Sequence, residues 1–275
     1  MDNIVKSITS LKSKFAENYK GNSHIHEAIP ISSSEFLTID ENDLDWLHKF
    51  AASNPIYYNS FEMEILDTPC RVYEGDINEY WLDSIKHDTS YAPFYPTWIL
   101  SAYALALETK NLGFDQVVDI GSGDGRISFC AKLIGIESFA IEIDEKLVEL
   151  QNKIASMTGI NFNPKIADAT KFDYKSLKLN RPAFFISGLP EMGEMLANSV
   201  IENITSIPDL KNTTTFVLSG SHLMRKNSRD HTKWGWGTVI ENFDLEVIKT
   251  LTLPTRWTVD QPIDTPYVFT TSRQK

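Results

Sequence analysis

Apolar runs typical of buried strands alternate with segments of helical period from residue 116 onward. Five such runs are QVVDIG, SFAIEID, NPKIADAT, AFFISGL and TTFVLSG, and helical segments cover 124–135, 145–159 and 191–204. Because helical crossovers separate them, these five strands should be parallel. Two further strands, DLEVIKTLTL and PYVFTTS, have no helix between them, so they should pair antiparallel at one edge. The predicted fold is α/β, a Rossmann-like doubly wound seven-stranded mixed sheet with its last strand antiparallel.

The first part of the chain follows a less regular pattern, and we interpret residues 1–89 as a mostly helical extension before a main domain at 90–275. Its first segment, IVKSITSLKSKFAENY, places Ile4, Ile8, Leu11 and Phe15 on one helical face, which favours a helix docked on the main domain. A short strand pair is expected around FEMEIL and CRVYEG. A helix then leads into the main domain, with Thr97 as its expected N-cap.

Composition narrows the class of protein. The chain has 275 residues, 42% hydrophobic and 23% charged, and a formal net charge of -11, which favours a compact fold and a cationic partner over a polyanion. Its two cysteines, Cys70 and Cys130, have no paired spacing, so neither a disulfide framework nor a metal site is expected. The sequence shows no secretory segment and no apolar run of about 18 residues. We therefore expect a cytoplasmic protein with no membrane association.

The segment VVDIGSGDGR carries the most chemical information. A buried strand runs into Gly121, Gly123 and Gly125, an arrangement that allows a tight turn and close approach of a nucleotide-type ligand. Glu142 follows at the end of the next strand, seventeen residues after Gly125, where a carboxylate binds ribose hydroxyls. The loop with this carboxylate predicts a nucleotide-type ligand.

Two ligand classes fit that loop, and charge separates them. A dinucleotide-binding dehydrogenase uses GxGxxG, whereas the third glycine here arrives one residue early. A pyrophosphate needs bare N–H groups at a helix start, and Asp119 and Asp124 would repel it. S-adenosylmethionine carries a sulfonium and an amino group and no phosphate, so acidic residues favour it.

At these residues the chain resembles the class I, seven-stranded S-adenosylmethionine-dependent methyltransferases, over roughly residues 91 to 275. The resemblance implies an enzyme that converts S-adenosylmethionine into S-adenosylhomocysteine without a metal. It implies that Asp119 engages the methionine amino end and that Glu142 binds the ribose. The remaining implied cofactor contacts lie beside the ligand or near the adenine amino group: Gly121, Ser122, Gly123, Asp168 and Ala169.

A narrower resemblance concerns the methyl acceptor. DIGSGDGRI, a preceding YxPxxPT segment and a fourth strand ending in LP look like the archaeal and mitochondrial protein lysine methyltransferases. This implies that Tyr91, Pro96 and Thr97 close over the cofactor. It also implies that Tyr91 and the turn after the fourth strand position the acceptor, through Gly188, Leu189 and Pro190. The D/N-P-P-Y motif of amine and amide methyltransferases is absent there, since Ser187 stands in the place of its Asp or Asn.

The acceptor stays open at the level of sequence. A lysine must lose its proton before it can react, and a dry aromatic channel favours the neutral amine; Tyr91, Phe94, Tyr95 and Trp98 are candidates for its walls. An RNA or tRNA methyltransferase is the alternative, because one basic and aromatic cluster follows the fifth strand: Arg225, Lys226, Arg229, Lys233, Trp234 and Trp236. A small-molecule methyltransferase and a non-catalytic S-adenosylmethionine-binding subunit are further alternatives.

Overall fold

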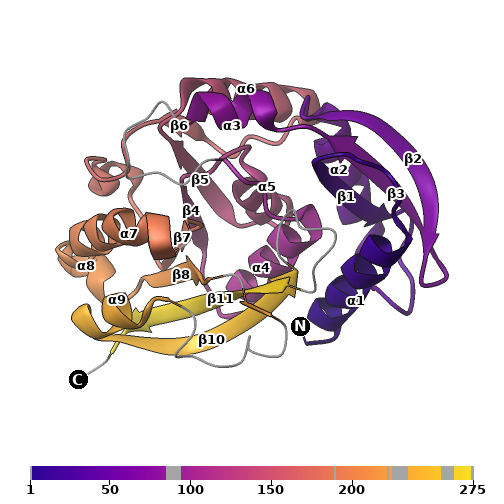
Figure 1. The fold of residues 1–275 in the computed structure, drawn as a ribbon. Helices are drawn as coiled ribbons and strands as arrows, with labels where there is room; N and C mark the ends of the chain where they lie inside the picture. The colour runs from indigo at the N-terminus through magenta and orange to yellow at the C-terminus, as the bar shows by residue number, and fades with distance from the viewer. Residues whose placement is uncertain are drawn as a thin grey trace.

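A seven-stranded mixed sheet forms the centre of the protein (Figure 1). The computed structural model describes residues 2–84, 94–188, 190–221, 223–224, 235–254 and 263–273. Within these ranges the strand order is β10-β11-β8-β7-β4-β5-β6, and the short β9 (Leu223–Met224) pairs with β11. The seven strands are β4 (Gln116–Ile120), β5 (Glu137–Glu142), β6 (Pro164–Ile166), β7 (Pro182–Ile186), β8 (Thr215–Ser219), β10 (Leu245–Pro254) and β11 (Ile263–Ser272).

The pairing confirms the predicted topology. β4 lies parallel to β5 and β7, β5 to β6, and β7 to β8. β11 is antiparallel to both β8 and β10, and it lies between them. From β4 the chain builds the sheet outward through β5 and β6, and then returns to place β7 on the other side of β4. In such a sheet the crevice for a ligand lies at the carboxyl ends of the strands, where the order reverses.

Each face of the sheet has its own hydrophobic core, as the alternation of side chains along a strand requires. Val117 on β4 belongs to one core, whereas Val118 and Ile120 belong to the other. The first core is covered by α4 (Ile99–Asn111), α5 (Arg126–Leu133) and α6 (Glu145–Thr158). The second is covered by the 3-10 turn η1 (Tyr174–Leu177), α7 (Pro190–Thr205), α8 (Pro208–Lys211) and α9 (Gly237–Asn242).

The N-terminal extension adds a small sheet and three helices on the side of α4, α5 and α6 (Figure 1). The predicted docking helix is confirmed as α1 (Asp2–Asn18), which buries Ile8, Leu11 and Phe15. The predicted strand pair is also confirmed and is longer than expected. The remaining elements are β1 (Ile25–Pro30), α2 (Glu41–Ser53), β2 (Tyr57–Ile65), β3 (Thr68–Gly75) and α3 (Asn78–Ser84).

Strand β1 was not predicted, and its sequence explains why. It reads IHEAIP and pairs antiparallel with β3, with all six residues buried. His26 and Glu27 interrupt its apolar pattern, yet both are buried at 3% or less exposure. One hydrophobic cluster joins Ile8 and Phe50 of the extension to Val117 of the main sheet, so a division of the chain at residue 89 stays a prediction.

The start of α4 differs from the expected capping. Trp98, not Thr97, is the N-cap residue, and the cap has no side-chain hydrogen bond of its own. The Thr97 hydroxyl lies 3.2 Å from the Tyr267 hydroxyl, and the Ile99 N–H donates to Glu27 Oε2 at 2.9 Å. N–H groups in the first turn of a helix have no acceptor within the helix. Here the Glu27 carboxylate of the extension is the acceptor for one of them, that of Ile99.

Three further observations concern sequence features without a place in the site. None of the helices in the described ranges combines the length and apolar character needed to cross a bilayer. Cys70 and Cys130 are buried free thiols, and burial raises the pKa of Cys70 to about 12. In the same ranges, no three His, Cys, Asp or Glu side chains gather as metal ligands would.

Candidate functional site

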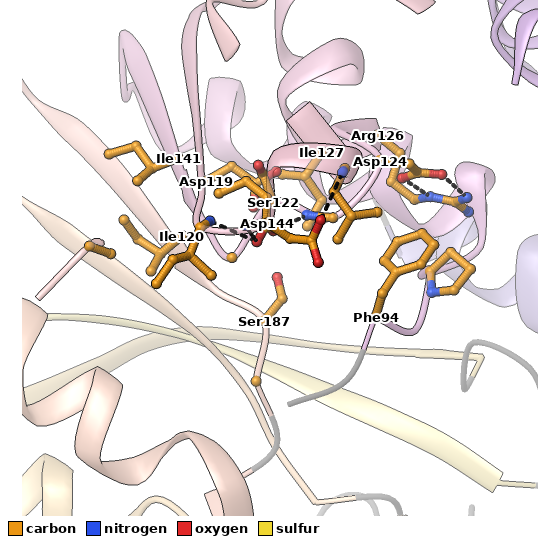
Figure 2. A pocket seen from close by; sticks show the side chains of 18 of the residues that line it. Phe94, Asp119, Ile120, Ser122, Asp124, Arg126, Ile127, Ile141, Asp144 and Ser187 are labelled. Atoms are coloured by element: carbon orange, nitrogen blue, oxygen red, sulfur yellow. Dashed lines mark hydrogen bonds and ion pairs between the residues drawn. The ribbon is translucent and has the colours of Figure 1, made fainter. Parts of the chain in front are cut away.

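A pocket opens at the carboxyl ends of β4 and β5, where the strand order reverses (Figure 2). The glycine-rich loop after β4 and the turn after β5 form one side, and Ser187 lies across from them in Figure 2. Its remaining walls come from the segment before α4, from α5, α6 and α7, and from the turns after β6 and β7. The residues of these walls include Phe94, Tyr95, Pro96, Thr97, Ile127, Leu147, Ala167, Ala169, Gly188 and Leu196.

The loop adopts a backbone that glycine makes possible at two places on the pocket wall. Gly121 has φ +65° and Gly123 has φ +57°, both in the left-handed region. A Cβ on Gly121 would meet no atom within 4 Å, so the bare backbone there is open to a ligand. A Cβ on Gly123 would lie 2.6 Å from the Phe94 ring, so Phe94 packs directly on the loop.

Asp119 contributes an unsatisfied buried carboxylate oxygen to this pocket. It lies in β4 next to the loop and is 1% exposed. Its Oδ2 accepts a long hydrogen bond of 3.4 Å from Ser128 Oγ, while Oδ1 has no hydrogen-bond partner. Burial raises the pKa of Asp119 to about 8; hydrogen bonding to Ser128 acts in the opposite direction, and the negative charges of Glu142 and Asp124 add to the rise. Such a group is costly to the fold unless a ligand supplies a donor or a positive charge.

Glu142 ties the end of β5 to the glycine-rich loop. Its Oε2 accepts from the Gly123 N–H at 2.9 Å, and its Oε1 accepts from the N–H groups of Ile143 and Asp144 at 2.8 and 3.0 Å. Burial raises its pKa, and these three hydrogen bonds act in the opposite direction. A carboxylate offers about four acceptor positions, so about one is left for a ligand hydroxyl.

Asp124 is held away from a ligand by its neighbours. Its Oδ1 accepts from Arg126 Nε at 2.9 Å, and its Oδ2 accepts from Arg126 Nη2 at 2.5 Å and from Asn54 Nδ2 at 2.9 Å. Figure 2 shows the paired side chains of Asp124 and Arg126 above Phe94. The charge of Asp124 is therefore compensated by a guanidinium, and within the described ranges no ion pair forms to Asp119 or Glu142.

The structure brings most of the predicted cofactor residues together and leaves some out. Pro96, Thr97, Asp119, Gly121, Ser122, Gly123, Glu142 and Ala169 all line the pocket, and so does the acceptor-positioning residue Gly188.

Asp168 is an exception among the predicted adenine contacts. Its Oδ1 accepts from the N–H and hydroxyl of Thr170, and its Oδ2 lies 2.8 Å from Lys171 Nζ. Its carboxylate thus closes its own turn and does not line the pocket, whereas Ala167 and Ala169 do. Pro190 begins α7 and is buried, but it does not line the pocket either.

Two tryptophan assignments from the sequence are corrected. Trp236 is completely buried in the core of the α7 face and donates Nε1 to the Ser219 carbonyl at 2.9 Å, so its ring cannot stack on a base. Trp98, considered as a wall of the acceptor channel, is 2% exposed and packs against Phe15 of α1, with 6.0 Å between the two ring centroids. Several further predicted residues lie outside the described ranges: Tyr91, Leu189, Arg225, Lys226, Arg229, Lys233 and Trp234.

Sequence reasoning missed the residues that surround Asp124. Arg126 lies directly after the glycine motif, but Asn54, Glu27 and Tyr57 come from the extension and reach it only in the folded chain. A buried charge requires partners, so Arg126 at the start of the helix was the one residue in the sequence that indicated a buried polar network around Asp124. Nothing in the sequence indicated which acidic or polar residues would supply them.

Comparisons with known proteins bear on the fold of this chain and not on its activity. No protein-family model and no curated protein matches the sequence. Among solved structures, one similar chain is magnesium protoporphyrin IX methyltransferase from Synechocystis with bound S-adenosylhomocysteine, at 15% identity and a TM-score of 0.45, covering 72% of this chain and 98% of that one. A Pyrococcus horikoshii protein matches at 14% identity and 0.45, covering 63% and 89%. The ribosomal protein L11 methylase from Lactobacillus delbrueckii matches at 14% and 0.40, covering 62% and 78%. Such values leave the activity of the present chain to be argued from its own residues.

Proposed function

We propose that this chain is an S-adenosylmethionine-dependent methyltransferase and that its acceptor is the side-chain amine of a protein lysine. The observation that carries the cofactor assignment is the unsatisfied Oδ1 of Asp119, buried in a side chain that lines the pocket. An amino group of a bound ligand, directly or through one water, supplies the missing donor and the missing positive charge. The α-amino group of S-adenosylmethionine is such a group.

The rest of the pocket suits the same ligand. The remaining acceptor position of Glu142 fits one ribose hydroxyl, and the open backbone at Gly121 allows close approach of the ligand. Ala167 and Ala169 give a small apolar wall for a flat ring. A pyrophosphate would instead meet Asp119 and Glu142 with no cation paired to either in the described part of the chain, and this argues against a dinucleotide.

S-adenosylmethionine, held by Asp119 and Glu142, would supply an electrophilic methyl carbon bonded to a sulfonium. A neutral amine would form an N–C bond to that carbon in line as the C–S bond breaks, S-adenosylhomocysteine would leave, and the methylated ammonium would lose its proton to solvent. The chain's contribution is to position that nitrogen about 3 Å from the carbon and to exclude water. Phe94 and Ser187 lie at the side of the pocket facing the glycine-rich loop (Figure 2), where an acceptor would enter. Gly188, which follows Ser187 in the chain, also lines the pocket. The carbonyl of Gly188 is a suitable acceptor for an amine N–H.

Electrostatics favours a cationic acceptor over a nucleic acid. Four carboxylates and one guanidinium are among the lining residues, namely Asp119, Asp124, Glu142, Asp144 and Arg126. The whole chain has a net charge of -11. A lysine is drawn to this field as the ammonium and loses its proton against the apolar side of the pocket, since desolvation lowers an amine pKa. A phosphate backbone is repelled by the same charges.

The test is a transfer assay with matched variants. The chain, Asp119→Asn and Asp115→Asn are incubated with methyl-tritiated S-adenosylmethionine and an extract of cells depleted of endogenous methylation. Asp115 is exposed one residue before the start of β4, so its variant makes the same chemical change outside the pocket. Protein, nucleic acid and small molecules are then separated, and labelled protein is hydrolysed to amino acids.

Methyllysine made by the unsubstituted chain and by Asp115→Asn, and lost with Asp119→Asn, would support the proposal. Label in RNA would replace the lysine acceptor with a nucleotide while keeping the cofactor. Label in small molecules would make the chain a small-molecule methyltransferase. Cofactor binding without transfer to any fraction would make it a non-catalytic binding subunit.

A further inference from the structure

The N-terminal extension reaches the glycine-rich loop through one buried polar network. Arg126 follows the loop at the start of α5 and is 3% exposed. Its guanidinium has five N–H donors, and every one has an acceptor. Two acceptors are the oxygens of Asp124, one is the Thr97 carbonyl, and the other two are Glu27 Oε1 and the Tyr57 hydroxyl from the extension.

The extension also contacts the loop directly. Asn54, the C-cap residue of α2, is 1% exposed and donates Nδ2 to Asp124 Oδ2 at 2.9 Å. The other end of its amide, Oδ1, accepts from the Ile56 N–H at 3.2 Å. Tyr57 donates its hydroxyl to Glu27 Oε1 at 2.9 Å, so the extension residues are joined to one another as well. Asp124 is thereby fixed by Arg126, the first residue of α5, and by Asn54, seventy positions earlier in the chain.

This loop needs such fixing because of its composition. Three of its five residues, 121 to 125, are glycines, which lose the most conformational freedom when they are ordered. Its two other side chains are both held from outside. Ser122 Oγ accepts from Gln151 Nε2 of α6 at 2.9 Å, and Asp124 is held by Arg126 and Asn54. The extension therefore supplies one of the attachments that define the loop against which a cofactor lies.

We infer that the N-terminal extension is part of the cofactor site, with Asn54, Tyr57 and Glu27 as positioning residues that hold the glycine-rich loop in its binding conformation. The inference rests on the proposed function, because it names the residues that order the same site. None of the three residues lines the pocket, so their effect passes through Asp124 and Arg126. The extension is then required for cofactor affinity and is more than a support for the fold.

The experiment compares Asn54→Ala with Asn59→Ala in the full chain. Asn59 lies on β2 and donates Nδ2 to Glu74 Oε2 at 2.8 Å. Each substitution therefore removes from the extension one side-chain amide that donates to a carboxylate. Only Asn54 reaches the loop. The dissociation constant for S-adenosylmethionine is measured by calorimetry, hydrogen exchange of the peptide containing 121–125 by mass spectrometry, and stability by urea unfolding.

We expect Asn54→Ala to raise the dissociation constant about tenfold, which corresponds to about 1.4 kcal/mol. Exchange at 121–125 should become faster. Asn59→Ala should match the unsubstituted chain in affinity and exchange. If Asn54→Ala does not fold, Tyr57→Phe removes a single hydroxyl from the same network and should raise the constant about threefold.

A purely structural role gives a different result. Asn54→Ala would then lower the urea midpoint while its cofactor affinity stayed within twofold of the unsubstituted chain, and this would overturn the inference. Failure of the cofactor assignment, on which the inference rests, is seen separately, because the unsubstituted chain would then bind no S-adenosylmethionine at all.

Discussion

Replacement of Asp119 by Asn should weaken cofactor binding and at the same time stabilise the empty protein at alkaline pH. The substitution keeps the shape of the side chain and removes its charge. Loss of one partner from a buried charged pair costs about 2 to 5 kcal/mol, so at a pH of about 8, where the carboxylate is available, we expect the dissociation constant for S-adenosylmethionine to rise at least about thirtyfold. Titration calorimetry of Asp119→Asn beside Asp115→Asn measures this.

The pH dependence of binding gives a second and more specific signature. The pKa of Asp119 in the empty protein is raised to about 8, mainly by burial, whereas a bound amino cation requires the carboxylate. Binding below pH 8 therefore releases a proton, and the affinity should fall about tenfold for each pH unit from 8 to 6. This dependence should vanish in Asp119→Asn. Calorimetry in buffers of different ionisation enthalpy counts the proton released.

Stability should change in the opposite direction to binding. Because the pKa of Asp119 is higher in the folded chain than its ordinary value of 3.8, its protonated form favours the fold. That contribution is complete below about pH 4 and is lost as the pH rises through about 8. Without ligand, Asp119→Asn should then unfold at a higher temperature than the unsubstituted chain at pH 8.5, with the difference shrinking toward pH 4. An equal affinity for cofactor, or a lower stability at pH 8.5, would refute this account of the carboxylate.

Three further predictions concern single residues. Glu142→Gln should raise the dissociation constant for S-adenosylmethionine about tenfold in calorimetry, because a charge-assisted hydrogen bond to the ribose becomes a neutral one. Gly193→Ala should lower kcat in the methyl-transfer assay and leave cofactor affinity unchanged, since its Cβ would lie 3.2 to 3.4 Å from the backbone of Gly188 and displace that turn. Trp236→Phe should lower the free energy of unfolding in urea by about 1 to 3 kcal/mol, because it leaves the Ser219 carbonyl buried without its donor and loses packing volume; RNA binding, if it is measurable, should not change.

The sheet and the position of the loop could be predicted from the sequence for a physical reason. Buried parallel strands are apolar on both faces, so Val117 and Val118 mark β4 even though they serve different cores. Glycines and carboxylates at the strand ends then indicate a ligand without knowledge of the rest of the fold. Such predictions depend on residues that are close together in the chain, as Asp119, Gly121 and Ser122 are.

The extension and the side-chain directions could not be predicted in the same way. β1 contains His26 and Glu27, and a polar residue in a short strand is indistinguishable from a loop until its partner is known. Asp168 follows β6, where the resemblance implies an adenine contact, and its carboxylate accepts two hydrogen bonds from Thr170 in its own turn. Trp236 lies near basic residues in the sequence, yet its ring completes a core. In each case contacts in space outweighed the local pattern.

The buried network changes how the acidic loop should be understood. By sequence alone, Asp119 and Asp124 are both acidic residues of the loop segment that would repel a pyrophosphate. In the structure the Asp124 carboxylate accepts hydrogen bonds from Arg126 and Asn54. Glu27, ninety-nine residues earlier than Arg126, accepts from the same guanidinium. The charge that selects the ligand is therefore left to Asp119 and Glu142. Since Asp124 is bonded to residues that order the loop and Asp119 lines the pocket, substituting the first should reduce affinity at every pH, whereas substituting the second should also abolish the pH dependence.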